Sequence, residues 1–424
     1  MAKNPAPWLT FFLVRFIGVL KHSVRPHPSL MTKNEFVYSR LATRLAFFTA
    51  GIATSPWASL VPYVKMRQNL DEMHYASLVL CFGLGAVIGM PLTGRLAARF
   101  GVKPIILVSC ITLYLGMVGL SLESLTLPLA FLSVIMWGMS LGIIDVANNI
   151  HGAYIEEKAG RHLMSSFHAW YTVGCIVAAL FCALALHLGL HSTAVSLMLS
   201  GAGIILLVYF YGKLINTHGE GSAGDEERET PSHKKTGLIP SYLTLPVLII
   251  GAICLIMYLT EGMIYDWSSV YLIQNGGLDI TIASVGYLAF EGAVALMRFR
   301  GDAIVTACGP LKLIVGGALL ACAGMVTIAL SHSPYVLVGA FFICGLALAN
   351  VVPVMLSETA RLAGAQQGKA ISFVGTLGYS GLLLGPGILG AVATVFGLSA
   401  MYVLTAALIF LLGLMALYVL TRIQ

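Results

Sequence analysis

Long apolar stretches alternate with short polar loops along most of the chain. A helix needs about 20 mainly apolar residues to cross the hydrocarbon core of a bilayer. Twelve stretches are long enough, and they lie at residues 42–64, 75–97, 104–122, 128–155, 164–188, 192–215, 242–272, 281–300, 311–331, 334–360, 370–396 and 399–421. The pattern predicts an all-α membrane protein with twelve transmembrane helices.

One polar segment separates the twelve stretches into two sets of six. Residues 216–237 are charged, rich in Gly and Ser and poor in apolar residues, which is typical of a flexible linker. We therefore expect one six-helix bundle over residues 35–215, a linker over 216–237 and a second bundle over 238–424. Residues 1–34 form an N-terminal extension. A cleaved signal peptide, an interfacial amphipathic helix and a native start at Met31 are all open for it, and the last is favoured.

The two halves share a sequence repeat. The pattern Gly-Ala-Val-x-x-Met-x-x-x-Gly occurs over residues 85–94 in the second stretch and again over residues 292–301 in the eighth. Shorter matches keep the same order, such as Ser166-Phe167 with Ser372-Phe373. Duplicated halves in a membrane chain indicate two pseudo-symmetric bundles and a transporter with its site between them.

Composition places the chain in the membrane class and argues against enzymes. Hydrophobic residues make up 58% of it and charged residues 10%, where soluble domains carry about 25%. Phosphate-binding loops, nucleophile elbows and Cys-x-x-Cys pairs are all missing from the sequence, so we expect no enzyme, no cofactor and no metal. The eight cysteines are expected to be packing residues.

Basic residues predict the orientation. With the N-terminus inside, the outer loops carry only Lys65 and Arg67, as the excess of cytoplasmic Lys and Arg requires. Both termini and the linker are therefore assigned to the cytoplasm, in a multi-pass protein of the cell inner membrane. Topology explains the net charge of +6 without a nucleic acid partner. The expected partners are the lipid bilayer, a small organic solute and a proton, and the chain is expected to be a monomer.

The loop after the second stretch resembles the signature of a known family. Gly94, Leu96, Arg99, Gly101 and Lys103 match the pattern Gly-x-Leu-Ala-Asp-Arg-x-Gly-Arg-Lys of the major facilitator superfamily. Ala98 stands where the family has Asp. The resemblance implies a transporter fold in which this loop helps to latch the cytoplasmic side by charge contacts with neighbouring helix ends. The expected gate residues are Gly94, Arg95, Arg99, Gly101 and Lys103, with Arg298 and Asp302 from the second half. The alternative is that the basic residues only set the orientation.

Further stretches are similar to a bacterial subgroup of that superfamily, uncharacterised inner-membrane permeases distantly similar to fucose permease. They include residues 145–149, 164–168, 261–268, 350–353 and 378–386. The resemblance covers about residues 35–421, and it implies transport without naming a substrate.

Acids within the apolar stretches are the candidates for proton coupling. A carboxylate in the bilayer centre costs a few kcal/mol, so it should face the bundle interior. Asp145, Glu261 and Glu291 are such acids, and His168 titrates in a suitable range. Asn148, Asn149, Gly152 and Glu156 share one helix face with Asp145. That face is expected either to line an aqueous path toward the cytoplasm or to form a buried structural network.

Aromatic and amide side chains are the candidates for solute contacts. They are Trp57, Asn148, Asn149, Trp170, Tyr171, Tyr265, Asn350 and Tyr379. Such groups suit a hydroxylated or amphipathic solute. The sequence thus predicts a secondary active transporter that works by alternating access and is driven by protons. An efflux pump for amphipathic drugs is one alternative. The drug exporters of the superfamily that this chain resembles carry a Gly-Pro-rich motif in the fifth span, and the lack of proline in stretch 164–188 disfavours this alternative. A membrane sensor that kept the fold but lost transport is another.

Overall fold

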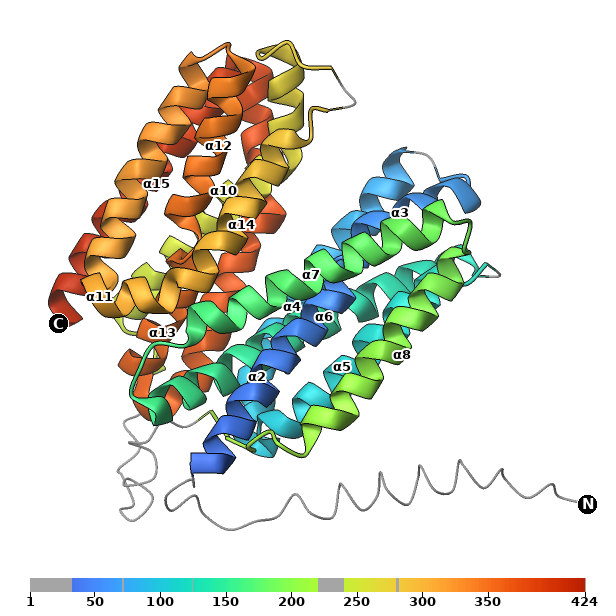
Figure 1. The fold of residues 1–424 in the computed structure, drawn as a ribbon, viewed down its shortest axis with the longest axis vertical. Coiled ribbons are helices and arrows are strands. Elements are labelled where there is room, and N and C mark those ends of the chain that lie inside the picture. The colour runs from blue at the N-terminus through green and yellow to red at the C-terminus, as the bar shows by residue number, and fades with distance from the viewer. Residues whose placement is uncertain (1–32, 71, 124, 220–239, 280–281, 424) are drawn as a thin grey trace, which may run out of the picture.

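The computed structural model describes residues 33–70, 72–123, 125–219, 240–279 and 282–423. All but the last two residues of the N-terminal extension, and linker residues 220–237, lie outside the described residues. The remaining chain forms two helical bundles (Figure 1). The predictions for the start of the chain therefore stay predictions.

The first bundle has seven helices because its first crossing is broken in two. They are α2 (Lys33–Thr54), α3 (Pro56–Arg67), α4 (Glu72–Phe100), α5 (Val102–Ser121), α6 (Leu127–Ala159), α7 (Met164–His187) and α8 (Ser192–Tyr211). The break between α2 and α3 lies at Pro56, which has no backbone N–H for the helical hydrogen bond. Each crossing overlaps the apolar stretch that predicts it, and apart from α2, which begins nine residues before the first stretch, the bounds agree within a few residues.

The second bundle follows the same plan. Its helices are α10 (Leu245–Gln274), α11 (Val285–Leu330), α12 (Pro334–Leu348), α13 (Val351–Ala363), α14 (Gln367–Phe396) and α15 (Leu398–Ile423). Helix α11 contains two crossings, since Gly309 has φ 81° and ψ 159° and is followed by Pro310. Helices α12 and α13 form one crossing with a kink at Asn350. The described residues thus contain the twelve predicted crossings, six in each bundle.

The bundles are close together at one end and apart at the other (Figure 1). We name the first the linker end: it holds the end of α4, the starts of α5 and α7, and the start of α14. Ser372 Oγ on α14 donates to Met90 O on α4 at 2.6 Å, and the backbone N–H of Ser166 on α7 donates to Asp302 Oδ2 on α11 at 3.2 Å. We name the other end the far end, where α12 begins and α10 finishes.

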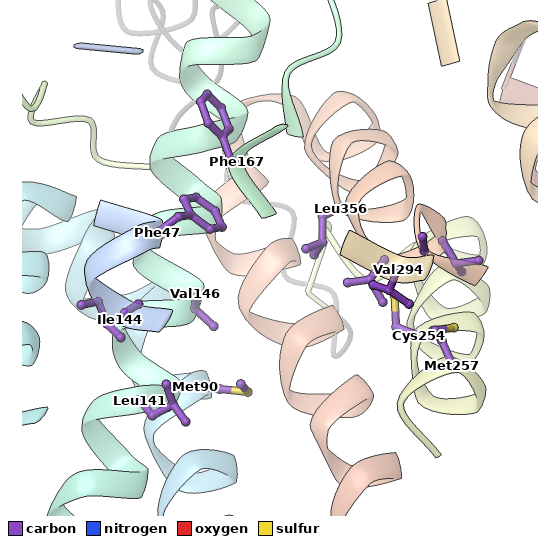
Figure 2. Close-up of a cluster of buried hydrophobic side chains, with 14 of the residues drawn as sticks. Phe47, Met90, Leu141, Ile144, Val146, Phe167, Cys254, Met257, Val294 and Leu356 are labelled. Carbon is purple, nitrogen blue, oxygen red and sulfur yellow. The ribbon is translucent and has the colours of Figure 1, made fainter. Parts of the chain in front are cut away.

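Each bundle has an apolar interior, and α14 brings the two together. Figure 2 shows Phe47, Ile144 and Phe167 within the first bundle and Cys254 and Met257 in the second. Phe47 and Phe167 stack with ring centroids 5.8 Å apart. A Cβ on Gly375 of α14 would lie 3.5 Å from Val146 Cγ2, so α14 approaches the first bundle closely.

Glycines let α4 and α6 pack closely. Gly85 and Gly89 on α4, and Gly138 and Gly142 on α6, each point at the backbone of the other helix. Small residues four apart are a common way for membrane helices to approach each other. The repeated glycine Gly292 on α11 has open space around it instead. The packing of Gly85 is therefore not repeated at Gly292, although Gly345 of α12 points at Phe290 O much as Gly138 points at Phe82 O.

This difference predicts unequal effects of two matched substitutions. The Cβ of Gly85→Ala would lie 2.7 Å from Ile135 O and 2.9 Å from Met139 N, while that of Gly292→Ala meets nothing within 4 Å. We expect Gly85→Ala to lower the free energy of unfolding by about 1–3 kcal/mol through overpacking. Gly292→Ala should be neutral. Denaturant unfolding in detergent measures both, and equal effects would contradict this packing.

Candidate functional site

A small cavity lies between the bundles, on the linker-end side of the middle of the helices. Its volume is ≈ 10 Å³, about enough for one water molecule. Its lining comes from four helices: Asp145, Val146 and Asn149 of α6, Cys254 and Tyr258 of α10, Val352 and Leu356 of α13, and Ile371, Val374 and Gly375 of α14. The predicted acid Asp145 therefore faces the second bundle, as the cost of a lipid-facing carboxylate requires.

Two tyrosines connect the acids of the two bundles. Tyr258 and Tyr379 lie with ring centroids 5.0 Å apart. The carboxyl groups of Asp145 and Glu261 are both within electrostatic range of both hydroxyl groups. Tyr171 of α7 is also within range of Asp145 and Tyr379. One acid from each bundle thus meets the same cluster of hydroxyl groups.

Arg298 lies near the middle of its crossing rather than in the loop after it. Its Nη1 donates to Thr172 Oγ1 on α7 at 3.0 Å, and its Nε donates to Ala349 O at 3.3 Å. The carbonyl of Ala349 is free because Pro353, four residues later, has no N–H to donate to it. Arg298 therefore joins the two bundles and also ties α11 to the kink of the next crossing.

The same guanidinium group compensates the charge of the acids. It lies within electrostatic range of Glu261 and of Glu291, two helical turns before it on α11. It also acts on Cys175 of α7, which lies near Glu291. Two carboxyl groups therefore share one fixed positive charge. We name Asp145, Tyr258, Glu261, Glu291, Arg298 and Tyr379 the central cluster.

The two asparagines of α6 make their hydrogen bonds within the first bundle. Asn148 Nδ2 donates to Ala46 O at 3.2 Å, and Asn149 Nδ2 donates to Asp145 O at 3.0 Å. Asn149 Oδ1 is then the acceptor for His168 Nε2 at 3.1 Å, so Nε2 of His168 carries a hydrogen in this contact. His168 is 7% exposed and packs on Phe47.

The rest of that helix face is occupied toward the linker end. Glu156 Oε2 accepts from the backbone N–H groups of Leu163 and Met164, at 2.6 and 2.8 Å, at the start of α7. Gly152 packs beside Phe167. These hydrogen bonds are those expected of the buried network, while Glu156 also lines a second cavity with Asp302 and Ser357.

The predicted solute-contact aromatics are spread over the molecule. Trp57 stacks on Phe82 at 4.2 Å and Trp170 lies edge-on to Phe48 at 6.0 Å, both within the first bundle. Tyr265 pairs with Tyr287 at 5.0 Å and is 52% exposed. Of the predicted solute-contact residues, Tyr379 belongs to the central cluster. Tyr171 and Asn149 lie beside its member Asp145.

Asn350 has a different environment. It is 2% exposed at the kink between α12 and α13, against Gly301 of α11. Within the described residues, its amide nitrogen and oxygen have no hydrogen-bond partner. A buried amide without a partner costs free energy, so this position is ready to bind a water or a solute group.

The predicted gate residues lie at the linker end, apart from Arg298. Gly94 packs on α14, where a Cβ would be 3.0 Å from Ser372 Cβ and 3.1 Å from Gly368 O. Gly101 has φ 78° and precedes α5, and Lys103 lies over the Tyr211 ring at 4.9 Å. Arg95 and Arg99 are exposed, and Arg99 covers Phe100 at 5.1 Å.

Asp302 makes the charged contact at this end. Besides Ser166, it lies in range of Arg44 and Arg40 of α2. The carboxylate thus sits between a helix start and two basic groups of the opposite bundle, where both favour its negative charge. The loop with Ala98 offers no side-chain acceptor.

Three residues of the site were missed in the sequence. Tyr258 is three positions before Glu261, on the same helix face, so helical spacing would have found it. Thr172 and Cys175 of α7 carry no such signal. They join the site only because α7 packs against α11.

Known proteins are similar to this chain in sequence and fold. The sequence profile of the Major Facilitator Superfamily matches residues 6–181, 43–306 and 289–424. The chain is 33% identical over 374 residues to an uncharacterised MFS-type transporter of Yersinia pestis, covering 88% of this chain and 94% of the relative. It is 30% identical over 354 residues to the uncharacterised transporter y4wD of Sinorhizobium fredii, covering 82% and 89%.

Solved structures agree on the fold. The transporter FucP in its outward conformation superposes with a TM-score of 0.77, at 15% identity, over 91% of this chain and 99% of that one. The proton:xylose symporter XylE gives 0.70, at 15% identity, over 91% and 95%. The family profile and the two relatives show the family, and the twelve crossings in two bundles fit it: the chain belongs to the Major Facilitator Superfamily.

Proposed function

We propose that this protein is a secondary active transporter that moves a small organic solute across the cell inner membrane by alternating access, coupled to protons. The observation that carries the proposal is the central cluster. Asp145 from one bundle and Glu261 from the other meet around Tyr258 and Tyr379. Buried acids at the interface of two bundles mark substrate and ion pathways in membrane proteins.

In this proposal the linker end is the cytoplasmic end, as the distribution of Lys and Arg favours. The contacts of Asp302 and Ser372 then close the cytoplasmic side, and the far end faces outward. The superposition on FucP in its outward conformation supports the same state. Rocking the bundles about the central cluster would expose it to each side in turn.

The acids supply the coupling. A carboxyl group that faces a low-dielectric interior favours its neutral form. When the bundles rock without solute, keeping such an acid ionised therefore costs free energy. Glu261 and Glu291 share the charge of Arg298. Asp145 lies on the other bundle, in the water-sized cavity. In a symport cycle, protons would bind these acids from the outer side together with the solute and leave toward the cytoplasm.

The surroundings of the cluster suit a hydroxylated or amphipathic solute. Tyr171, Tyr258 and Tyr379 offer hydroxyl groups and ring faces. The unpartnered amide of Asn350 adds a donor and an acceptor close by. The related folds include a fucose:proton symporter and a proton:xylose symporter, which fits this class of solute.

A transport assay tests the proposal. A thermal-shift screen of sugars, polyols, amino acids and drugs at two pH values first finds a solute, and proteoliposomes then measure its uptake. A gradient of one pH unit should drive up to about tenfold accumulation for one coupled proton. We expect Asp145→Asn with Glu261→Gln to abolish this accumulation. Unchanged pH-driven uptake by that double variant would disprove the coupling and leave an uncoupled facilitator.

A further inference from the structure

The residues after α8 are bound to the linker end of the first bundle. We name Ile215–Gly219 the strap. Its composition predicts the beginning of a flexible linker, yet Thr217 is 6% exposed and Gly219 is also buried. The backbone N–H of Ile215 donates to His151 Nε2 on α6 at 3.2 Å. The first part of the predicted linker is therefore packed against the first bundle.

The strap binds the loop between α4 and α5. Thr217 O accepts from Val102 N at 2.8 Å, and Asn216 Oδ1 accepts from Lys103 N at 3.0 Å. Asn216 Nδ2 donates to Phe100 O at 3.2 Å. These groups at the start of α5 and the end of α4 have no partner within their own helices. The strap satisfies them and so holds the loop in one conformation.

The last residue of the strap reaches the second bundle. Gly368 N donates to Gly219 O at 3.0 Å. Gly368 is the second residue of α14, so its N–H also lacks a partner within its helix. The two backbones touch, since a Cβ on Gly368 would lie 3.0 Å from Gly219 Cα and 3.3 Å from Gly219 O. Gly219 has φ 73°, which favours glycine there.

The starts of α7 and α14 share one feature: each donates a backbone N–H to an acceptor across the interface between the bundles. At the start of α7, the opposite bundle supplies the carboxylate of Asp302 as the acceptor. At the start of α14, the neighbouring loop has Ala98 and no carboxylate. There the acceptor is the carbonyl of Gly219, and the side chain of His218 lies 3.4 Å from Ala98 O.

We propose that the strap is a second latch of the closed linker end, and that it takes the place of the carboxylate that Ala98 does not provide. This inference rests on the proposed alternating access. The strap makes several hydrogen bonds to the first bundle and one to α14, so it stays with the first bundle when the linker end opens. The contact between Gly219 and Gly368 then breaks, and it forms again on closure.

Hydrogen–deuterium exchange of the purified full chain tests the strap without a known solute. In Gly368→Ala the added methyl group separates the two backbones. We expect exchange to rise about tenfold in peptides over residues 366–372 and 164–170, which contain the N–H groups that bond across the interface, and this rise corresponds to about 1.4 kcal/mol. Exchange should fall at the far end, over residues 185–195 and 270–279, because in alternating access the far end closes when the linker end opens. Gly387→Ala is the matched control on α14, with nothing within 4 Å of its Cβ.

A rescue separates a latch from local damage. Ala98→Asp in the Gly368→Ala background should restore protection at the linker end, because a carboxylate can again accept from the start of α14. A change confined to residues 366–372, or no rescue, would overturn the latch. The Asp302→Asn variant shows whether a negative result contradicts the strap alone or the proposed alternating access. If Asp302→Asn shifts both ends and Gly368→Ala shifts neither, only the strap is wrong; if neither variant shifts them, the proposed rocking motion is wrong.

Discussion

Replacing Arg298 by alanine should reduce solute uptake by at least about 100-fold. The guanidinium group bonds Thr172 across the interface and Ala349 at the kink, and its charge acts on Glu261 and Glu291. Removing it leaves two buried acids without compensation and frees a buried carbonyl. Losing one partner of a buried charge network costs about 3 kcal/mol or more, which corresponds to that factor.

Uptake in proteoliposomes measures the effect, with Arg300→Ala as the matched control. Arg300 is exposed on the same helix, two residues later, so its removal should leave uptake unchanged. Arg298→Lys keeps the charge but loses the planar fork, and it should transport at an intermediate rate. If Arg298→Ala transported as fast as wild type, neither charge compensation nor the bond to Thr172 would be needed for transport.

Replacing Asp302 by asparagine should open the linker end. The amide of the Asp302→Asn variant would keep a weak acceptor for Ser166 N but lose the charge that faces the start of α7, Arg44 and Arg40. Charge-assisted hydrogen bonds exceed neutral ones by about 1–1.5 kcal/mol. The equilibrium between the two conformations should therefore shift about tenfold toward the one that is open at this end.

The thiol of Cys175 is a suitable reporter for this shift once the other seven cysteines are replaced by alanine. It lies near Glu291 and Arg298 in the interface and forms no disulfide. We expect a membrane-impermeant maleimide to label it faster from the cytoplasmic side in Asp302→Asn and more slowly from the outer side. Asp266→Asn, at an exposed acid nearer the far end of α10, is the control and should change neither rate. Equal labelling of all three proteins would show that Asp302 is no latch.

The membrane topology could be predicted from the chain alone. Crossing a bilayer takes a fixed length of apolar helix, so the stretches at 104–122 and 192–215 locate α5 and α8 within a few residues. The same physics places Asp145 and Glu261 toward the interior, because a carboxylate facing lipid is costly. These are local properties, and they do not depend on which helix lies beside which.

Contacts between helices were harder to predict. Arg298 was expected in the gate because it lies where the second half matches the basic loop of the first half, but the structure places it near the middle of its crossing, in bonding distance of Thr172. Asn148 was expected to contact solute, and its amide bonds Ala46 O in the first bundle. Residues 216–219 were assigned to a flexible linker from composition, and the free ends of α4, α5 and α14 hold them in place. In each case the partner is far away in sequence.

The sequence by itself determined the twelve crossings, the division into two halves and the few acids that must avoid lipid, since hydrophobic length and charge act residue by residue. The tertiary structure alone decided that Pro353 frees the carbonyl that Arg298 binds, that Gly85 is packed while Gly292 is open, and that Gly219 caps α14 beside Ala98. Those outcomes depend on the register and approach of packed helices, which follow from the shapes of both surfaces together.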